Sequence, residues 1–296
     1  MIAKKHRQAW LSLLLLLLPG IALASLDVVA TTTSMGMLVK EIGGDRVTVK
    51  TLAAPDRDTH YLQAKPSMML ALRRADLVVA VGADLEIGWL PSALQNSANP
   101  KVRQGNTGYF EAALHTELKD KGVADRSLGD VHPAGNPHFN LDPMRMGEIA
   151  VALAKKLGAL DKENADYYAA NQRALTQRLT ALTEQLKLKS KSANGVLLMH
   201  NGAKYLLDRL GVVSWGFMEP VPGIPPTASH IKSLRDRLKT KQGVIIYAPY
   251  HQQEAPNKLA KELNWPSFII PIEPAESSYK EYEALMVRWA NALAEG

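Results

Sequence analysis

The sequence predicts an α/β protein whose two halves, each with a mainly parallel sheet, are joined by one long α-helix. Short runs rich in β-branched residues alternate with helical patterns along most of the chain, which is typical of parallel sheets. One uninterrupted helical pattern separates the earlier runs from the later ones. The chain has 296 residues, is 46% hydrophobic and contains no cysteine. It can therefore bury a large core, but it has no disulfides and no thiolate metal ligands.

Residues 1–24 have the layout of a secretory signal peptide. Lys4, Lys5 and Arg7 come first, and an apolar stretch from Ala9 to Leu18 follows. This stretch is shorter than the ~20 residues that span a bilayer, and small residues up to Ala24 suit cleavage there. No cysteine is present to carry a lipid anchor. We therefore expect a soluble periplasmic protein after cleavage near Ala24.

Six apolar runs are predicted to be strands, and two helices have clear start signals. The runs are 27–31, 47–53, 77–81, 195–199, 244–248 and 268–270. A helix is expected to begin near Ser67, after a turn-rich link. Another is expected at Asp142 and Pro143, which suit the N-cap and the first helical position, and to end at Gly158.

The long helix is predicted from about 162 to 189, where neither Gly nor Pro occurs. At 1.5 Å per residue it would be roughly 40 Å long, more than a small domain needs. Two interpretations are open: residues 161–190 join an N-terminal lobe (25–160) to a C-terminal lobe (191–296), or the helix simply covers the surface through one apolar stripe. The stripe recurs at spacings of 7, 4, 3 and 4 and comprises Tyr168, Leu175, Leu179, Leu182 and Leu186.

Three of the eight histidines stand where a ligand could bind. His60 lies in the link after the second run, His138 comes just before the helix start at Asp142, and His200 directly follows the fourth run. Ligands of open α/β sheets bind beyond the carboxyl ends of strands. Three imidazoles can hold Zn²⁺ when a fourth ligand completes the tetrahedron. Each histidine can also be an ordinary hydrogen-bonded one, and separations of 78 and 62 residues match no local metal motif.

Five segments carry a resemblance to a known family. They are 58–67 (DTHYLQAKPS), 75–82 (ADLVVAVG), 136–143 (NPHFNLDP), 199–201 (MHN) and 219–226 (EPVPGIPP). From about Val28 to its C-terminus, the chain resembles the solute-binding proteins of bacterial zinc and manganese ABC importers. The resemblance implies a metal ion held in the cleft between two lobes, with His60, His138 and His200 as ligands. It also implies a binding protein rather than an enzyme.

The resemblance leaves the fourth ligand open. The family commonly has an Asp directly after a late strand, and Pro271 occupies that place in this sequence. A carboxylate, another histidine or a water molecule could complete the site. Each candidate side chain can equally be a solvated loop residue. The candidates are Glu273, Glu276, His132 and His251.

We expect the protein to capture Zn²⁺ and to deliver it, as a monomer, to an inner-membrane ABC permease driven by an ATPase. Three neutral imidazoles favour Zn²⁺, because Mn²⁺ sites usually contain more carboxylate oxygen. A manganese-binding protein of the same type is the main alternative. An exported zinc hydrolase could also use three histidines and water, but no acid or base partner stands at a recognisable spacing. An adhesin with this fold is a further alternative.

The net charge does not indicate a nucleic-acid partner. The formal charge is +6, and three basic residues but no acidic ones lie within residues 1–24. The remaining lysines and arginines are dispersed and form no basic aromatic platform. We therefore expect no nucleic-acid binding.

Overall fold

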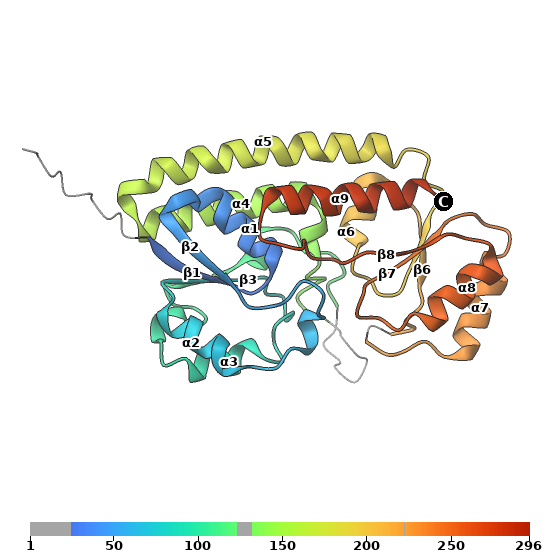
Figure 1. Ribbon diagram of the computed structural model, residues 1–296, viewed down its shortest axis with the longest axis horizontal. Coiled ribbons are helices and arrows are strands. Elements are labelled where there is room, and N and C mark those ends of the chain that lie inside the picture. The colour runs from blue at the N-terminus through green and yellow to red at the C-terminus, as the bar shows by residue number, and fades with distance from the viewer. Residues whose placement is uncertain (1–24, 123–131, 222) are drawn as a thin grey trace, which may run out of the picture.

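A computed structural model of the protein describes residues 25–122, 132–221 and 223–296. The predicted signal peptide, residues 1–24, lies outside the described residues. The described chain forms two four-stranded parallel sheets at opposite ends of an elongated molecule (Figure 1). This arrangement confirms the predicted fold class. No helix among the described residues is both long and apolar enough to cross a membrane.

The first sheet has the strand order β2-β1-β3-β4. Its strands are β1 (Leu26–Ala30), β2 (Val47–Thr51), β3 (Leu77–Ala80) and β4 (Tyr109–Glu111). Successive side chains of a strand point to opposite faces, so Val28 packs with helix α1 (Thr33–Gly43) in one apolar cluster. Val29 packs in another cluster, with α2 (Pro66–Arg74) and α3 (Leu90–Asn96). Both faces of the sheet are thus covered.

The second sheet has the strand order β6-β5-β7-β8. Its strands are β5 (Val196–Leu198), β6 (Ser214–Phe217), β7 (Val244–Tyr247) and β8 (Ser267–Ile269). Helices α7 (Ala228–Leu238) and α8 (Glu254–Leu263) pack against one face. Helix α6 (Lys204–Leu210) contributes to the cluster on the other face. The two sheets therefore have the same layered plan.

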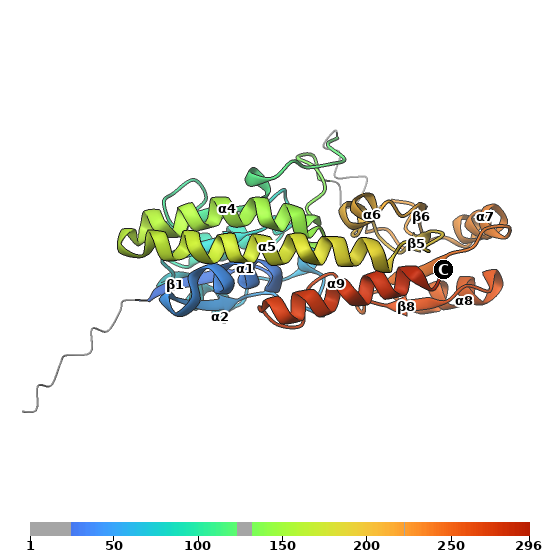
Figure 2. The same ribbon diagram turned by 90° about the horizontal axis from the view of Figure 1, so that it is seen from above.

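Three helices run along the length of the molecule (Figure 1). They are α4 (Pro143–Leu160), α5 (Ala165–Lys189) and α9 (Tyr279–Ala294). Two of them, α5 and α9, extend across the boundary between the lobes. Helix α5 packs against α1, α4 and α9, and the view from above shows it extending from the first lobe over the second (Figure 2). Its predicted apolar stripe is buried. One continuous apolar cluster includes this stripe and residues from both sheets.

Helix α4 starts as predicted but ends later than predicted. The Asp142 side chain accepts a hydrogen bond from the Met144 backbone at 3.0 Å and so caps the helix. The helix then continues past Gly158 to Leu160, so the prediction that it ends at Gly158 was wrong. A Cβ at position 158 would lie 3.1 Å from the Cβ of Ala165. A larger side chain here would crowd the start of α5, so the glycine allows a close approach of the two helices and does not terminate α4.

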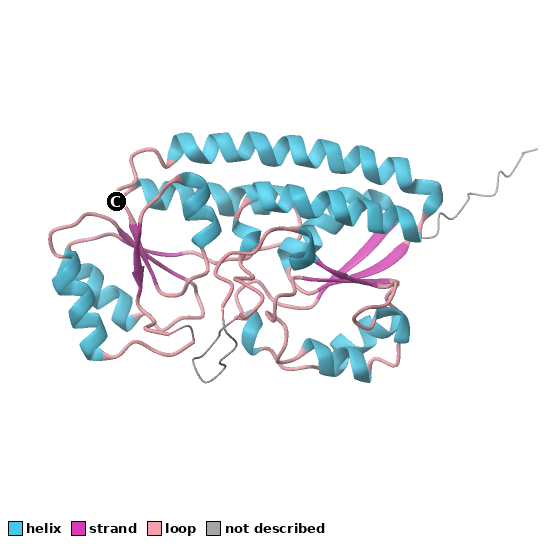
Figure 3. Cartoon of the chain, turned by 180° about the vertical axis from the view of Figure 1, so that it is seen from behind, coloured by secondary structure: helices cyan, strands magenta, loops and turns pink. Residues whose placement is uncertain are grey.

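All six predicted strands are present, within two residues at each end. Two further strands, β4 and β6, were not predicted. Both lie at the edges of their sheets, and Figure 3 shows the two sheets as separate groups of strands. The β6 sequence, SWGF, contains a polar residue and a glycine, and none of its residues is fully buried. An edge strand of this kind lacks the apolar run that marks a central strand.

Candidate metal centre

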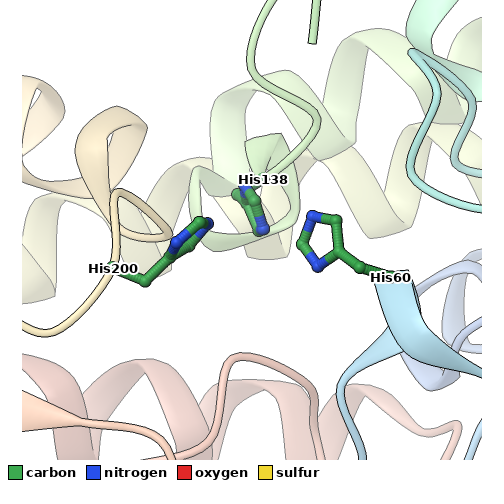
Figure 4. A group of neighbouring side chains, drawn as sticks. All are labelled: His60, His138 and His200. Carbon is green, nitrogen blue, oxygen red and sulfur yellow. The ribbon is translucent and has the colours of Figure 1, made fainter. Parts of the chain in front are cut away.

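His60, His138 and His200 converge between the two lobes, although they are far apart in the sequence. One ligand atom from each ring lies within 4.8 Å of the other two. The ring centroids are 5.3 Å apart for His60 and His138, 5.3 Å for His138 and His200, and 5.8 Å for His60 and His200. Figure 4 shows the three rings side by side on three separate segments.

Short local structures hold the three backbones in place. His60 lies in a single 3-10 turn, Thr59–Tyr61, which Asp58 caps. His138 immediately precedes another such turn, Phe139–Leu141, which leads into α4. His200 follows β5 after one intervening residue. The first lobe, the segment leading to the connecting helices, and the second lobe thus each contribute one imidazole.

Each of the three rings donates its Nδ1 hydrogen to an oxygen. The acceptors are Asp58 Oδ1 at 2.7 Å from His60, Asn136 Oδ1 at 2.8 Å from His138, and Glu219 Oε2 at 2.8 Å from His200. The amide orientation of Asn136 is fixed, because its Nδ2 donates to the Asn201 carbonyl at 2.9 Å. In each ring, Nε2 is therefore the nitrogen left to bind a metal ion, and the oxygen sets the ring orientation.

The roles of Asp58, Asn136 and Glu219 were not predicted from the sequence. Two of them leave a signal, because Asp58 and Asn136 each stand two residues before a site histidine. In both cases the same side-chain oxygen also accepts the backbone N–H of that histidine, at 3.0 Å and 2.9 Å. Glu219 leaves no local signal, because it is 19 residues from His200 and follows the unpredicted strand β6.

The pKa shifts of His138 and Asp58 favour the protonation states that suit a bound cation. His138 is only 3% exposed, and burial lowers its pKa well below the usual value, as do the nearby His200 and His60. Its imidazole is therefore neutral. Burial raises the pKa of Asp58. The hydrogen bond from His60 and the charge of His60 lower this pKa by more, so the net shift is downward. The Nε2 of His138 is buried and accepts no hydrogen bond within the described chain.

A cavity of about 650 Å³ opens beside the histidines. Asp58 and His60 of the first lobe line it together with His200, Glu219 and Tyr250 of the second. Because both lobes contribute, the site lies in a cleft between them. A metal ion could reach two of the three imidazoles through this space.

The structure separates the four candidates for a fourth ligand. Among the described residues, the group whose ligand atoms all lie within 4.8 Å of one another contains only the three histidines already named. His132 contacts that group, with its Nε2 at 3.1 Å from the Nε2 of His60. His251 lines the cavity, and its Nδ1 accepts the Ala248 backbone N–H at 3.0 Å. Glu276 is exposed.

Glu273 has a different role within the fold. It is buried, and its carboxylate accepts hydrogen bonds from the Ser34 backbone at 2.7 Å and from the Thr33 hydroxyl at 3.0 Å. The Asn140 amide donates to its other oxygen at 3.1 Å. Burial raises the pKa of Glu273 to about 7, although these donors lower it. Its carboxylate therefore caps the start of α1 across the lobe boundary.

The family profile for the periplasmic zinc-uptake complex component A, ZnuA, matches residues 28–296. The chain belongs to the ZnuA family. ZnuA-family proteins bind metal ions as substrate-binding components of ABC importers and are not enzymes, so the hydrolase alternative is set aside. The match covers both lobes and the connecting helices.

Relatives of this ZnuA-family chain include both zinc and manganese proteins. The high-affinity zinc uptake system protein ZnuA of Yersinia pestis is 24% identical over 87% of this chain and 86% of its own. The manganese ABC transporter substrate-binding lipoprotein PsaA of Streptococcus pneumoniae is 28% identical over 82% of this chain and 78% of its own. The binding protein FpvC of Pseudomonas aeruginosa, solved with Mn²⁺, has a TM-score of 0.77 at 24% identity and covers 91% of this chain and 97% of its own. FpvC therefore shares the fold.

Proposed function

We propose that this protein captures Zn²⁺ outside the cytoplasm and delivers it to a cognate ABC permease driven by an ATPase. His60, His138 and His200 bind the ion through Nε2. The protein acts as a periplasmic monomer after cleavage near Ala24, and its metal lies between lobes 25–160 and 191–296, which the segment 161–190 connects. The ion is cargo, so the site must both hold it and release it.

The orientation of the three rings carries this proposal. Each Nδ1 is engaged by an oxygen, so the three Nε2 atoms are the ones that bind the ion. The buried Nε2 of His138 supports it further, because a buried acceptor without a donor is costly. A metal ion supplies the missing interaction at that atom.

The donor set supports Zn²⁺ over Mn²⁺. Imidazole nitrogen suits zinc, whereas carboxylate oxygen suits manganese. Asp58 and Glu219 are carboxylates that line the cavity at the site, and each one accepts a hydrogen bond from a site histidine. Manganese binding is the alternative within the family, and direct competition between the metals decides between them.

The test is metal binding by the purified full chain and by His138→Ala, with His115→Ala as a matched control. His115 stacks on Phe110, and it does not line the cavity at the site. We expect His138→Ala to lose zinc affinity by orders of magnitude with an unchanged circular dichroism spectrum, and His115→Ala to bind normally. Wild-type protein that retains manganese against equimolar zinc would overturn the choice of metal. Undiminished zinc binding by His138→Ala would overturn the proposed site.

Acid should weaken zinc binding, because protons compete for the same nitrogens. Calorimetry at about pH 7.5 and about pH 5.5 brackets the ordinary histidine range near 6.5. We expect markedly lower affinity at the lower pH. Equal affinity at both would contradict an imidazole site.

A further inference from the structure

His132 lies on the same loop as His138, and its ring lies beside that of His60, with the ring centroids 5.2 Å apart. The carbonyl of His132 accepts the Gly135 N–H at 2.9 Å, which closes a tight turn just before Asn136 and His138. The Asn136 N–H in turn donates to the Lys119 carbonyl at 2.8 Å. Two backbone contacts therefore hold the loop that carries His132 and His138.

The orientation of the His132 ring is set by the Ala83 carbonyl. Its Nδ1 lies 3.0 Å from that oxygen. A carbonyl oxygen only accepts hydrogen bonds, so Nδ1 carries a hydrogen, and in the neutral ring the lone pair is on Nε2. This is the same tautomer that Asp58 imposes on His60.

The two Nε2 atoms of His60 and His132 are only 3.1 Å apart. When both rings are neutral, each Nε2 presents a lone pair to the other, and the two atoms can stay this close only when a proton or a metal ion lies between them. Two nitrogens on one tetrahedral zinc ion, at about 2.0–2.1 Å from it, are about 3.4 Å apart. The observed separation is close to that value. No such argument applies to Glu273, whose carboxylate is engaged by α1.

We propose that His132 is the fourth metal ligand and that the cargo binds to four imidazoles. This inference rests on the proposed function, and it identifies the ligand that replaces the carboxylate expected at Pro271. His132 stands outside the group of three that lies within 4.8 Å, and its ring centroid is 6.2 Å from that of His138. Its ring therefore moves toward His138 and His200 when the ion binds. Four nitrogen donors and no oxygen donor strengthen the preference for Zn²⁺ over Mn²⁺.

The experiment compares the full chain with His132→Ala, and His115→Ala is the control. Zinc affinity is measured by competition with a chelator, and X-ray absorption at the zinc edge counts the bound imidazoles. We expect four imidazoles in the wild type and in His115→Ala, and three in His132→Ala. Removing an outer-shell partner costs roughly 10–100-fold in affinity, and the loss of a direct ligand should cost at least as much. His132→Asp, which returns a ligand atom, should recover part of the affinity.

The outcomes separate this inference from the proposed function. Zinc binding that is lost in His138→Ala but unchanged in His132→Ala, with three imidazoles in both the wild type and His132→Ala, would overturn the role of His132 alone. Failure of the wild-type chain to bind zinc would overturn the proposed function and this inference together. If His132→Ala unfolds, the imidazole count of the wild type and the affinity of His132→Asp decide the question.

Discussion

Three oxygen acceptors decide which nitrogen each site histidine presents to the cleft. In two cases the acceptor belongs to the residue two positions earlier, so that Asp58 orients His60 and Asn136 orients His138. The same oxygen also fixes the histidine backbone. No contact between distant parts of the chain is needed there, because the orienting residue stands two positions before the histidine.

Glu219 is the acceptor whose contribution is easiest to isolate. It receives the His200 Nδ1 hydrogen and the Gly223 N–H on one oxygen, at 2.8 Å and 2.9 Å. Glu219→Ala should free the His200 ring and weaken zinc binding by roughly 10–100-fold. Chelator competition measures the change. Glu254→Ala is a suitable control, because Glu254 is exposed and also lines the cavity; equal affinities for the two variants would contradict the orienting role.

Burial of neutral His138 makes the metal-free protein sensitive to acid. Its pKa is lowered in the folded state, whereas the unfolded chain titrates near 6.5. The unfolded state then binds more protons, so this group contributes stability above about pH 6.5 that is lost as pH falls through the folded pKa.

The urea concentration at the unfolding midpoint of the metal-free protein should therefore decrease as pH is lowered below about 6.5. His138→Gln, which cannot titrate, should show a shallower fall over the same pH range. Parallel pH profiles for the two proteins would mean that His138 does not contribute this dependence.

The elements differ in how clearly their sequences mark them. Central strands such as β3 are buried throughout and read as continuous apolar runs. The edge strands β4 and β6 are three and four residues long and partly exposed, so nothing local distinguishes them from loops. Gly158 resembles a helix-ending signal in the sequence, but in the structure it lies where α4 and the start of α5 approach each other closely.

Helix α5 allows a matched test of its apolar stripe. Leu182 is 2% exposed and belongs to the continuous cluster, whereas Leu188 on the same helix is 76% exposed. Leu182→Ala should lower the free energy of unfolding by about 2–5 kcal/mol, because it leaves a cavity. Leu188→Ala should change it by less than about 0.5 kcal/mol. Urea denaturation measures both, and similar losses would contradict the burial of the stripe.

The whole molecule is joined by more than its linking helix. One apolar cluster reaches from β1 in the first lobe to β7 in the second, and Glu273 caps α1 across the boundary. The Tyr282 hydroxyl also donates to the Asn140 carbonyl at 2.7 Å. Packed interfaces of this kind permit small shifts more readily than hinge rotations.

Metal release should therefore leave the overall shape nearly unchanged. Small-angle X-ray scattering of the zinc-loaded and chelator-treated protein should give scattering curves that superpose over the low-angle range. Local rearrangement of the site would still be visible as changes in histidine NMR signals. A clear increase in the radius of gyration on zinc removal would instead indicate a hinge opening of the lobes.

At the scale of the whole molecule, the sequence predicts the fold more completely than it predicts the metal site. The layered plan follows from local periodicity, and the three histidines follow from their segments. The remaining groups depend on long-range packing: Glu219 approaches His200 because β6 lies beside β5. His132 approaches His60 across 72 residues. Neither of these contacts can be predicted from the local sequence pattern.

The last helix of the chain has a consequence for the order of events during biogenesis. Helix α9 packs against α1 and α5, so the final turns of the polypeptide complete a surface that begins near its first strand. A chain threaded through a membrane pore with its N-terminus leading would keep α1 without this partner until the last residues emerge. Helix α1 therefore reaches its final set of contacts only after residues 279–294 have been made, so the first and the last helices of the chain complete their packing together.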